Sequence, residues 1–249
     1  MKIDILTLFP EMVKAVLSES IVGRAIKEGK VEINVINYRD FSKDKHKRVD
    51  DYPFGGGRGM VIGIQPIYDC LQSLDLTNAK ILLTSPQGKV FTQKKAEELS
   101  QEQHIVIICG HYEGIDYRVT EHLIDEEVSI GDYVLTGGEL PALIIVDAVT
   151  RLIPGVLPDD ATTGDSFSMG LLEYPQYTRP QDFLGWKVPE ILLSGNHQQI
   201  AKFRLKESLR NTYLKRPDLL EHYPLNEEEK QLLNEIIMEE QEKIRKKNS

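Results

Sequence analysis

The first part of the chain alternates between short apolar runs and segments with a helical pattern. Five runs rich in Ile, Val and Leu predict strands, at residues 2–9, 31–38, 80–85, 104–109 and 125–130. Helical patterns occupy residues 20–29, 65–74, 92–100 and 139–153, with Ser20 and Thr92 as candidate N-caps. A run as continuously apolar as HIVIIC is typical of a strand buried on both faces. The alternation therefore predicts an α/β fold with a mostly parallel sheet.

From Pro154 onward this pattern is lost. The stretch PGVLPDDATTGDSFSMG is rich in Pro, Gly and small polar residues, which predicts a flexible linker. Helical patterns return after it, with Asn196 and Asn226 as candidate N-caps of two long helices. We therefore predict an α/β domain at residues 1–158, a flexible interdomain linker at 159–172 and a small helical domain at 173–249.

The composition is that of a globular protein, with 41% hydrophobic and 28% charged residues. No apolar run approaches the roughly 18–20 residues that a membrane-spanning helix needs, and MKIDILTLFPEM lacks a signal-peptide cleavage pattern. Cys70 and Cys109 lie far apart in apolar surroundings, which favours reduced core residues over a metal or redox site. These features predict a cytoplasmic protein with no membrane partner.

The net charge of −9 argues mildly against a nucleic acid partner, but the charge is unevenly distributed. Residues 39–48 carry a net charge of +3 and residues 202–216 one of +5, whereas residues 221–240 carry −6. A basic stripe on an acidic body is compatible with RNA binding, because phosphates respond to the local field within a Debye length of roughly 8–10 Å. A solvated helix surface has the same composition, so the charge pattern leaves both interpretations open.

Three of the predicted strands end in glycine-containing loops that carry polar side chains. The loops are LLTSPQG, ICGHYEGID and VSIGDYVLTGGELP, and they contain Ser85, Glu113 and Asp132. Ligands of open α/β sheets bind at the carboxyl ends of the strands, and glycine lets the backbone approach a ligand closely. The loops therefore predict a pocket at one common edge of the sheet, although each could also be a tight turn that binds nothing.

Common nucleotide-binding and metal-binding signatures are missing. No GxxxxGK[ST] loop occurs, and GGGRGMVIG does not follow a buried strand, as a dinucleotide fingerprint must. We interpret these glycines as a mobile surface loop in which Arg58 is available to a polyanion. His46 and His111 have no partners at ligand spacing, so we predict that they are surface or structural residues and expect no metal site.

Seven sequence blocks carry a more specific signal. PFGGGRGM, SPQG, CGHYEGID, SIGDYVLTGGELPA, RLIPGV, DSFSMGLLEYPQYTRP and LLSGNH, in this order and spacing, resemble the bacterial tRNA (guanine-N1)-methyltransferases of the TrmD type, which belong to the SPOUT class. The resemblance covers the chain up to about Pro217. It implies a SPOUT-type parallel sheet with a C-terminal trefoil knot, followed by the small helical domain. It also implies a homodimer with each active site shared between the chains.

The resemblance further implies a reaction and the residues that perform it. A methyl group would pass from S-adenosyl-L-methionine to N1 of guanosine 37, in the anticodon loop of tRNA, with Asp165 as general base and Arg151 stabilising the charge at O6. The cofactor-binding residues would be Leu83, Thr84, Ser85, Pro86, Gln87, Gly110, Tyr112, Glu113, Ser129, Ile130, Gly131, Asp132, Tyr133, Val134, Leu135, Gly137, Gly138 and Pro141. The RNA-binding residues would be Arg58, Ser166, Phe167, His197, Lys202, Arg204, Lys206 and Arg210. A contact of Glu113 with the methionine end of the cofactor or with Mg²⁺ is a weaker implication.

Two other functions stay open. An α/β oxidoreductase with a C-terminal oligomerisation domain fits the composition, but the sequence lacks a GxGxxG motif after a strand and an acidic partner for a ribose. A non-catalytic RNA-binding relative would keep the pocket without the chemistry. Asp165 and Arg151 argue against that relative, because it need retain neither.

Overall fold

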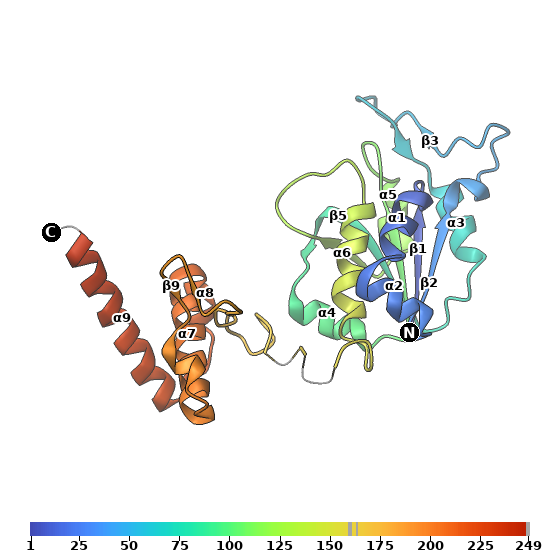
Figure 1. Cartoon of the computed structure of the whole chain (residues 1–249). Helices are drawn as coiled ribbons and strands as arrows, with labels where there is room; N and C mark the ends of the chain where they lie inside the picture. The colour runs from blue at the N-terminus through green and yellow to red at the C-terminus, as the bar shows by residue number, and fades with distance from the viewer. Residues whose placement is uncertain (159–160, 163, 248–249) are drawn as a thin grey trace. The chain divides into compact units, whose positions relative to one another are not determined.

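The structure, a computed structural model, describes residues 1–158, 161–162 and 164–247. The chain forms two compact units, Met1–Asp159 and Asp160–Ser249 (Figure 1). Residues 159, 160 and 163 of the predicted linker lie outside the described part of the chain. Across the described residues, no helix is both long enough and apolar enough to cross a membrane.

Five parallel strands form the main sheet of the first unit, in the order β2-β1-β6-β5-β7 (Figure 1). They are β1 (Lys2–Thr7), β2 (Glu32–Asn37), β5 (Ala79–Val90), β6 (His104–Cys109) and β7 (Glu126–Ser129). The parallel α/β sheet predicted from the alternating pattern is therefore confirmed. The first strand is shorter than predicted, because the chain turns after Thr7, whose hydroxyl accepts a hydrogen bond from the Phe9 N–H at 2.9 Å.

Six helices accompany the sheet. They are α1 (Pro10–Leu17), α2 (Ser20–Lys27), α3 (Ile64–Gln72), α4 (Gln93–Ser100), α5 (Tyr117–His122) and α6 (Glu139–Thr150). Thr92 caps α4 as predicted, since its hydroxyl accepts from the Lys95 N–H at 3.3 Å. Ser20 does not cap α2: the N-cap position is Glu19, which makes no side-chain cap bond. The sequence pattern did not predict α1 and α5, which have only eight and six residues.

Every residue of β6 is buried, and its side chains alternate between two apolar clusters. Ile105 and Ile107 pack with residues of α1, α2, α4 and α6, whereas Val106 and Ile108 pack with residues of α3 and α5. Because successive side chains of a strand point to opposite faces, a continuously apolar strand satisfies both clusters. The sheet is thus the middle layer of three. Cys109 belongs to the first cluster and Cys70 to the second, so both cysteines are core residues, as predicted.

The glycine-rich segment at residues 55–59 lies on a surface loop. Two short antiparallel strands, β3 (Asp50–Asp51) and β4 (Val61–Ile62), bracket it. Gly55, Gly56, Gly57 and Gly59 all have positive φ angles, a conformation that favours glycine. Figure 1 shows this loop at the top of the first unit, beyond the ends of the main strands.

The second unit is mainly helical. It contains a short hairpin of β8 (Asp182–Phe183) and β9 (Trp186–Lys187), the 3₁₀ turn η2 (Glu190–Leu193), and the helices α7 (His197–Lys215), α8 (Pro217–Leu220) and α9 (Glu227–Lys247). Asn196 caps α7, and Asn226 forms a reciprocal capping box with Glu229 at the start of α9, with N···O distances of 2.8 and 2.9 Å. Leu171, which the prediction placed in the linker, is buried in the core of this unit.

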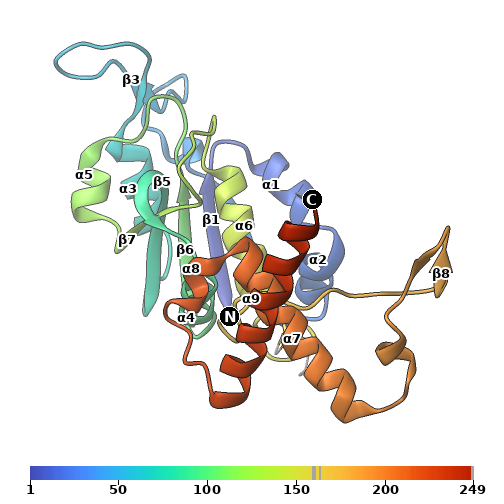
Figure 2. The ribbon, with the colours of Figure 1, turned by 90° about the vertical axis from the view of Figure 1, so that its left-hand side faces the viewer.

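The helices α7 and α9 lie side by side (Figure 2), and ion pairs join them. The Lys206 ammonium lies 2.7 Å from Glu235 and 2.9 Å from Glu239, and Arg210 binds Glu240 at 2.6 Å. Hydrogen bonds from Arg210 and Lys206 lower the pKa of Glu239. A lowered folded-state pKa means that this stabilisation is present above the ordinary glutamate pKa and is lost as the pH falls through the lowered value.

Replacing Arg210 by Ala should destabilise the second unit, because three carboxylates of α7 and α9 lose their shared cation. We expect its free energy of unfolding to fall by about 1–3 kcal/mol. Lys202→Ala is the matched control: its pair with Glu228 is longer, at 3.5 Å, and exposed, and should contribute no more than about 0.5 kcal/mol. Hydrogen exchange of the α7 amides, measured by mass spectrometry, reports on this unit. Equal exchange in both variants would contradict the expectation.

Candidate functional site

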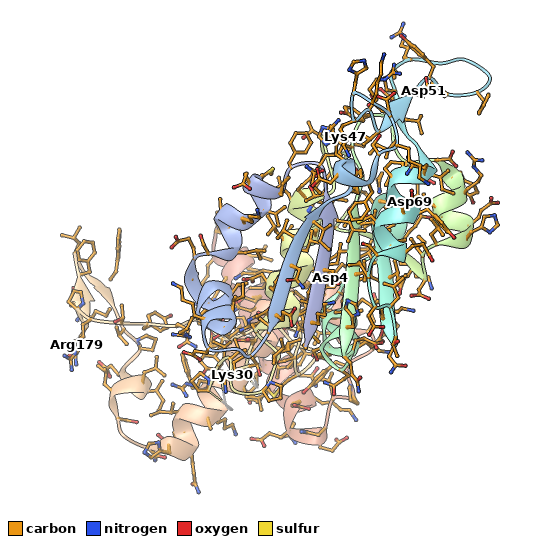
Figure 3. The ribbon with its side chains drawn as sticks, turned by 90° about the vertical axis from the view of Figure 1, so that its right-hand side faces the viewer. Asp4, Lys30, Lys47, Asp51, Asp69 and Arg179 are labelled. Carbon is orange, nitrogen blue, oxygen red and sulfur yellow. The ribbon has the colours of Figure 1, made fainter. Side chains whose placement is uncertain are left out.

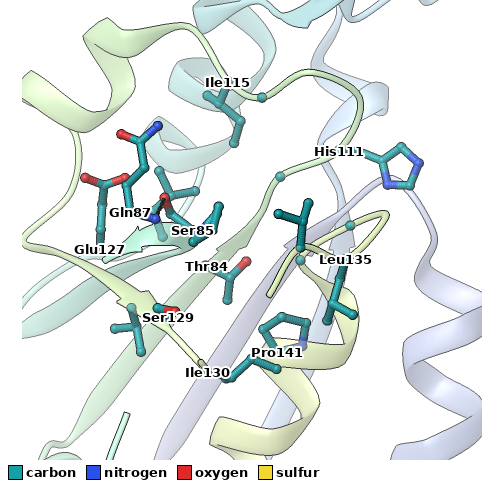
Figure 4. Close-up of a pocket in the computed structure, with 18 of the residues that line it drawn as sticks. Thr84, Ser85, Gln87, His111, Ile115, Glu127, Ser129, Ile130, Leu135 and Pro141 are labelled. Atoms are coloured by element: carbon teal, nitrogen blue, oxygen red, sulfur yellow. Dashed lines mark hydrogen bonds between the residues drawn. The ribbon is translucent and has the colours of Figure 1, made fainter. Parts of the chain in front are cut away.

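The loops that follow β6 and β7, together with a bulge in β5, line one cavity at the carboxyl edge of the sheet (Figure 4). The three strands are neighbours in the order β6-β5-β7 and run parallel, so these segments meet at the same edge. The cavity has a volume of about 350 Å³. The common pocket predicted from the three glycine-containing loops is therefore present.

All but one of the predicted cofactor-binding residues line this cavity. They are Leu83, Thr84, Ser85, Pro86, Gln87, Gly110, Tyr112, Glu113, Ser129, Ile130, Gly131, Tyr133, Val134, Leu135, Gly137, Gly138 and Pro141. Asp132 is not among the lining residues. It sits between Gly131 and Tyr133 in a tight turn, where the Tyr133 N–H donates to the Gly131 carbonyl at 2.9 Å. The loop's polar contribution therefore comes from other residues than the aspartate that the sequence suggested.

The first wall of the cavity is a bulge within β5, not a loop after the strand. The pairing of β5 with β7 shifts between Thr84 and Lys89, and the strand resumes as far as Val90. The residues between, which the sequence placed in a loop after the strand, bulge out of the ladder. The bulge requires glycine at its end, because a Cβ on Gly88 would overlap the Glu127 carbonyl.

The loops after β6 and β7 form the second and third walls of the cavity, and their backbones are in direct contact. The Gly138 N–H donates to the Gly110 carbonyl at 2.8 Å. A Cβ on Gly138 would overlap the Thr84 hydroxyl and lie 2.9 Å from the Cys109 Cα. His111 and Gly137 also form an antiparallel bridge. The loop after β6 and the start of α6 can therefore approach this closely only because residue 138 is glycine.

Two polar and two apolar side chains mark different sides of the cavity (Figure 4). Gln87 and Glu127 lie together on one side, and Leu135 and Pro141 on the other. Tyr112 and Glu113 add an aromatic ring and a second carboxylate to the lining. Such a lining suits a ligand with both a flat apolar group and a cationic one.

A buried carboxylate, which the sequence pattern does not reveal, lies next to His111 of the cavity lining. Glu139, the first residue of α6, is 3% exposed, and one of its oxygens accepts from the Thr7 hydroxyl at 2.8 Å. Its other oxygen lies 3.9 Å from His111 Nδ1. The helix dipole stabilises a negative charge at the N-terminus of a helix, which is where this carboxylate lies. His111 lines the cavity, so it belongs to the site and is not simply a surface residue.

The two predicted catalytic residues belong to different units. Arg151 is the C-cap residue of α6 in the first unit. Asp165 lies in the second unit, on a turn in which the Ser168 hydroxyl donates to the Asp165 carbonyl at 2.7 Å. The Phe167 N–H donates to the Leu171 carbonyl at 2.8 Å, which closes the same segment. Around Asp165 the described chain is thus a hydrogen-bonded turn, and the catalytic roles of both residues stay predictions.

The structure separates the predicted RNA-binding residues into two groups. Lys206 and Arg210 are largely covered and engaged with carboxylates of α9, so we no longer count them as candidate RNA contacts. Lys202 pairs more weakly with Glu228. The remaining candidates are Arg58 on the glycine loop, Ser166 and Phe167 on the Asp165 turn, and His197 and Arg204 on α7.

Within the described residues, no group of three or more His, Cys, Asp or Glu side chains could hold a metal ion. Glu113, the residue considered for Mg²⁺, lines the cavity without such a group around it. The donor set near Glu113 therefore does not fit a dedicated Mg²⁺ site, which normally uses several oxygen ligands.

Comparison with known proteins shows what kind of protein carries this cavity. The family model described as tRNA (Guanine-1)-methyltransferase TrmD matches residues 1–222. The chain belongs to this family. Among curated relatives, the tRNA (guanine-N(1)-)-methyltransferase of Geobacillus kaustophilus is 60% identical over 94% of this chain and 98% of its own length. Those of Bacillus subtilis and Dictyoglomus turgidum are 56% and 55% identical, over 94% and 98% of this chain and 98% and 100% of their own lengths.

Replacing Gly138 by Ala should disrupt the cavity through contact alone. The backbone of Gly138 (φ −85°, ψ −3°) is one that alanine adopts readily, so the overlap with Thr84 is what the substitution introduces. We expect the free energy of unfolding to fall by about 1–3 kcal/mol, as for other overpacked sites. Urea unfolding measures it.

Gly110→Ala is the matched control for this prediction. It faces Gly138, but a Cβ there would make only ordinary contacts, at 3.5 and 3.6 Å from Ile115. Its free energy of unfolding should change by less than about 0.5 kcal/mol. If Gly110→Ala were as destabilised as Gly138→Ala, the overlap at Gly138 would not be the cause.

Proposed function

We propose that this protein transfers a methyl group from S-adenosyl-L-methionine to N1 of guanosine 37 in tRNA. Family membership supports the reaction and the substrate class. The cavity formed by the β5 bulge and the loops after β6 and β7 supports S-adenosyl-L-methionine as the methyl donor, because its volume and its glycine-containing backbone suit a small molecule. Position 37 rests on the sequence resemblance.

The lining of the cavity fits the proposed donor. S-adenosyl-L-methionine combines an adenine ring, a sulfonium and an amino acid end, and it supplies an electrophilic methyl group. The glycine-containing loops after β6 and β7 would surround the adenosine, with Leu135 and Pro141 against its apolar surface. Glu113 and Glu127 would attract the cationic parts, since a carboxylate favours a nearby positive charge.

The trefoil knot is part of the proposal and rests on the family resemblance. The third loop and α6 would form the threaded portion. The close contact of Gly138 with Gly110 supports this proposal, because a threaded chain needs backbones that pass with little room between them. We also propose a homodimer in which the two chains share each active site.

Arg151 and Asp165 would supply the chemistry at the guanine. Guanine N1 carries a proton and is a poor nucleophile, so a base must remove that proton as the methyl group arrives. The Asp165 carboxylate would accept it in a concerted transfer. The Arg151 guanidinium, which is always charged and offers several donors, would stabilise the negative charge that develops at O6. Holding N1 in line with the methyl carbon and the sulfur is the other contribution of the site.

The two alternative functions are an oxidoreductase and a non-catalytic RNA-binding relative. Membership of a methyltransferase family removes the support for an oxidoreductase. A non-catalytic relative would bind S-adenosyl-L-methionine without producing methylated RNA. Unmodified tRNA transcripts with G or A at position 37 separate these cases: methylation of the G transcript alone supports the proposal, and donor binding without methylation of either transcript contradicts it.

Asp165→Asn should abolish turnover while leaving donor binding intact. Loss of a general base typically costs 10²–10⁴-fold in rate, so we expect kcat to fall by at least about a hundredfold. The dissociation constant for S-adenosyl-L-methionine, measured by isothermal titration, should change less than about twofold. Glu221→Gln, which alters an exposed carboxylate of the same unit, should keep full activity. A kcat within about threefold of the unchanged protein would exclude Asp165 as the base.

Added salt should weaken the use of tRNA far more than the binding of the donor. Phosphate contacts release counterions, so the KM for tRNA should rise at least about tenfold between 50 and 200 mM salt. The dissociation constant for S-adenosyl-L-methionine should stay nearly constant, because its cavity contacts involve few net charges. Steady-state kinetics and titration at matched salt concentrations measure the two. A flat KM would contradict the proposed cationic RNA contacts.

A further inference from the structure

Apolar side chains are concentrated on a projecting part of the second unit. We call residues 174–188 the aromatic arm; it carries the β8–β9 hairpin at its tip (Figure 2). All residues from Gln176 to Lys187 are exposed. Phe183, Leu184 and Trp186 are 54%, 81% and 73% exposed. Trp186 is the only tryptophan of the sequence. A cluster of large exposed apolar residues of this kind marks a binding surface.

The hairpin holds its rings in a defined arrangement. Leu184 and Gly185 form the turn with positive φ angles of 55° and 87°, the combination found in tight hairpin turns. Asp182 accepts from the Gly185 N–H at 2.8 Å, and the Val188 N–H donates to the Gln181 carbonyl at 2.9 Å. The Phe183 and Trp186 rings lie 6.0 Å apart at an angle of 50°. The rings are therefore presented by a short, hydrogen-bonded scaffold.

Cationic side chains accompany the rings. Between residues 174 and 204 the sequence has four Lys and Arg residues against two Asp and Glu residues. Over the part of the chain that the structure describes, Arg179, Lys187 and Arg204 take part in no ion pair, in contrast to Lys206 and Arg210. Arg179 lies at the base of the hairpin (Figure 3). Of the two carboxylates, Asp182 is already used within the turn.

A cavity of about 390 Å³ lies beneath the arm. Tyr174, Tyr177, Arg179, Ile200 and Arg204 contribute to its lining, and the Arg204 guanidinium lies 4.9 Å from the centre of the Tyr174 ring. Exposed rings, unpaired cations and a partly apolar cavity on one segment match the way proteins bind single-stranded nucleic acid, with bases stacked on rings and phosphates on cations. A purely apolar protein partner would not explain the cations.

We propose that the aromatic arm binds an unpaired nucleotide of the tRNA substrate, distinct from the guanine that is methylated. A base stacks on Trp186, with Phe183 packed beside the indole, and Arg179, Lys187 and Arg204 contact the adjoining phosphates. The inference rests on the proposed function in that it takes tRNA as the substrate.

The single tryptophan allows a direct test on the unaltered protein. Titration with an unmodified tRNA transcript should quench the Trp186 emission to saturation, because stacking on a base quenches the indole. A fully paired RNA duplex of similar length is the matched control and should produce little quenching. Absence of quenching by the transcript overturns the inference. A change of emission on dilution of the protein alone, with none on addition of RNA, assigns the arm to a second copy and also overturns it.

Kinetics of variants provide the second test. Trp186→Ala should raise the KM for tRNA about tenfold and leave kcat and the dissociation constant for S-adenosyl-L-methionine unchanged. Trp186→Phe, which keeps a ring, should restore most of the lost affinity. Met238→Ala removes a similarly exposed apolar side chain of α9 and should change nothing. Weaker donor binding in Trp186→Ala, or an unchanged KM for tRNA, overturns the inference.

The two proposals fail in different ways. If the unaltered protein quenches with tRNA but forms no methylated guanosine, the proposed function is refuted and RNA binding by the arm is supported. If it methylates guanosine 37 while Trp186→Ala keeps the same KM for tRNA, the inference about the arm is refuted and the proposed function is supported.

Discussion

The cavity depends on the close approach of two backbones, at Gly110 after β6 and at Gly138 before α6. Their hydrogen bond of 2.8 Å joins the end of a fully buried strand to the start of a largely buried helix. The core that packs β6 and α6 therefore also fixes the loops that line the cavity. The same contact explains why Glu139 is buried. As the first residue of α6 it lies in the interior, where the Thr7 hydroxyl and the helix N-terminus stabilise its carboxylate.

The second unit shows why a local sum of charges is a poor guide to an RNA-binding surface. The basic stretch of α7 and the acidic stretch of α9 were distinct in the sequence, but they face each other in the fold. Lys206 and Arg210 are used for internal ion pairs there. Arg204, on the same helix, instead lies over the Tyr174 ring. Which cations remain available is thus decided by helix packing, which composition does not report.

Features set by neighbouring residues could be predicted, and features set by distant contacts could not. The apolar runs located the five main strands, and Thr92, Asn196 and Asn226 were found as caps because a cap acts within one turn. The bulge of β5 was mistaken for a strand end, because only the pairing of Lys89 with Val128 reveals that the strand resumes. The approach of His111 to Glu139 likewise joins residues that no sequence spacing connects.

The two proposed catalytic residues come from different units of the chain. Arg151 ends a helix of the first unit, whereas Asp165 belongs to a turn of the second, closed by bonds from Ser168 and Phe167. The local conformation around Asp165 is therefore defined within its own unit. What the proposed reaction still requires is a defined arrangement of that unit around the guanine. In the proposed reaction the bound tRNA would supply it through the guanine itself, so substrate binding would complete the active site.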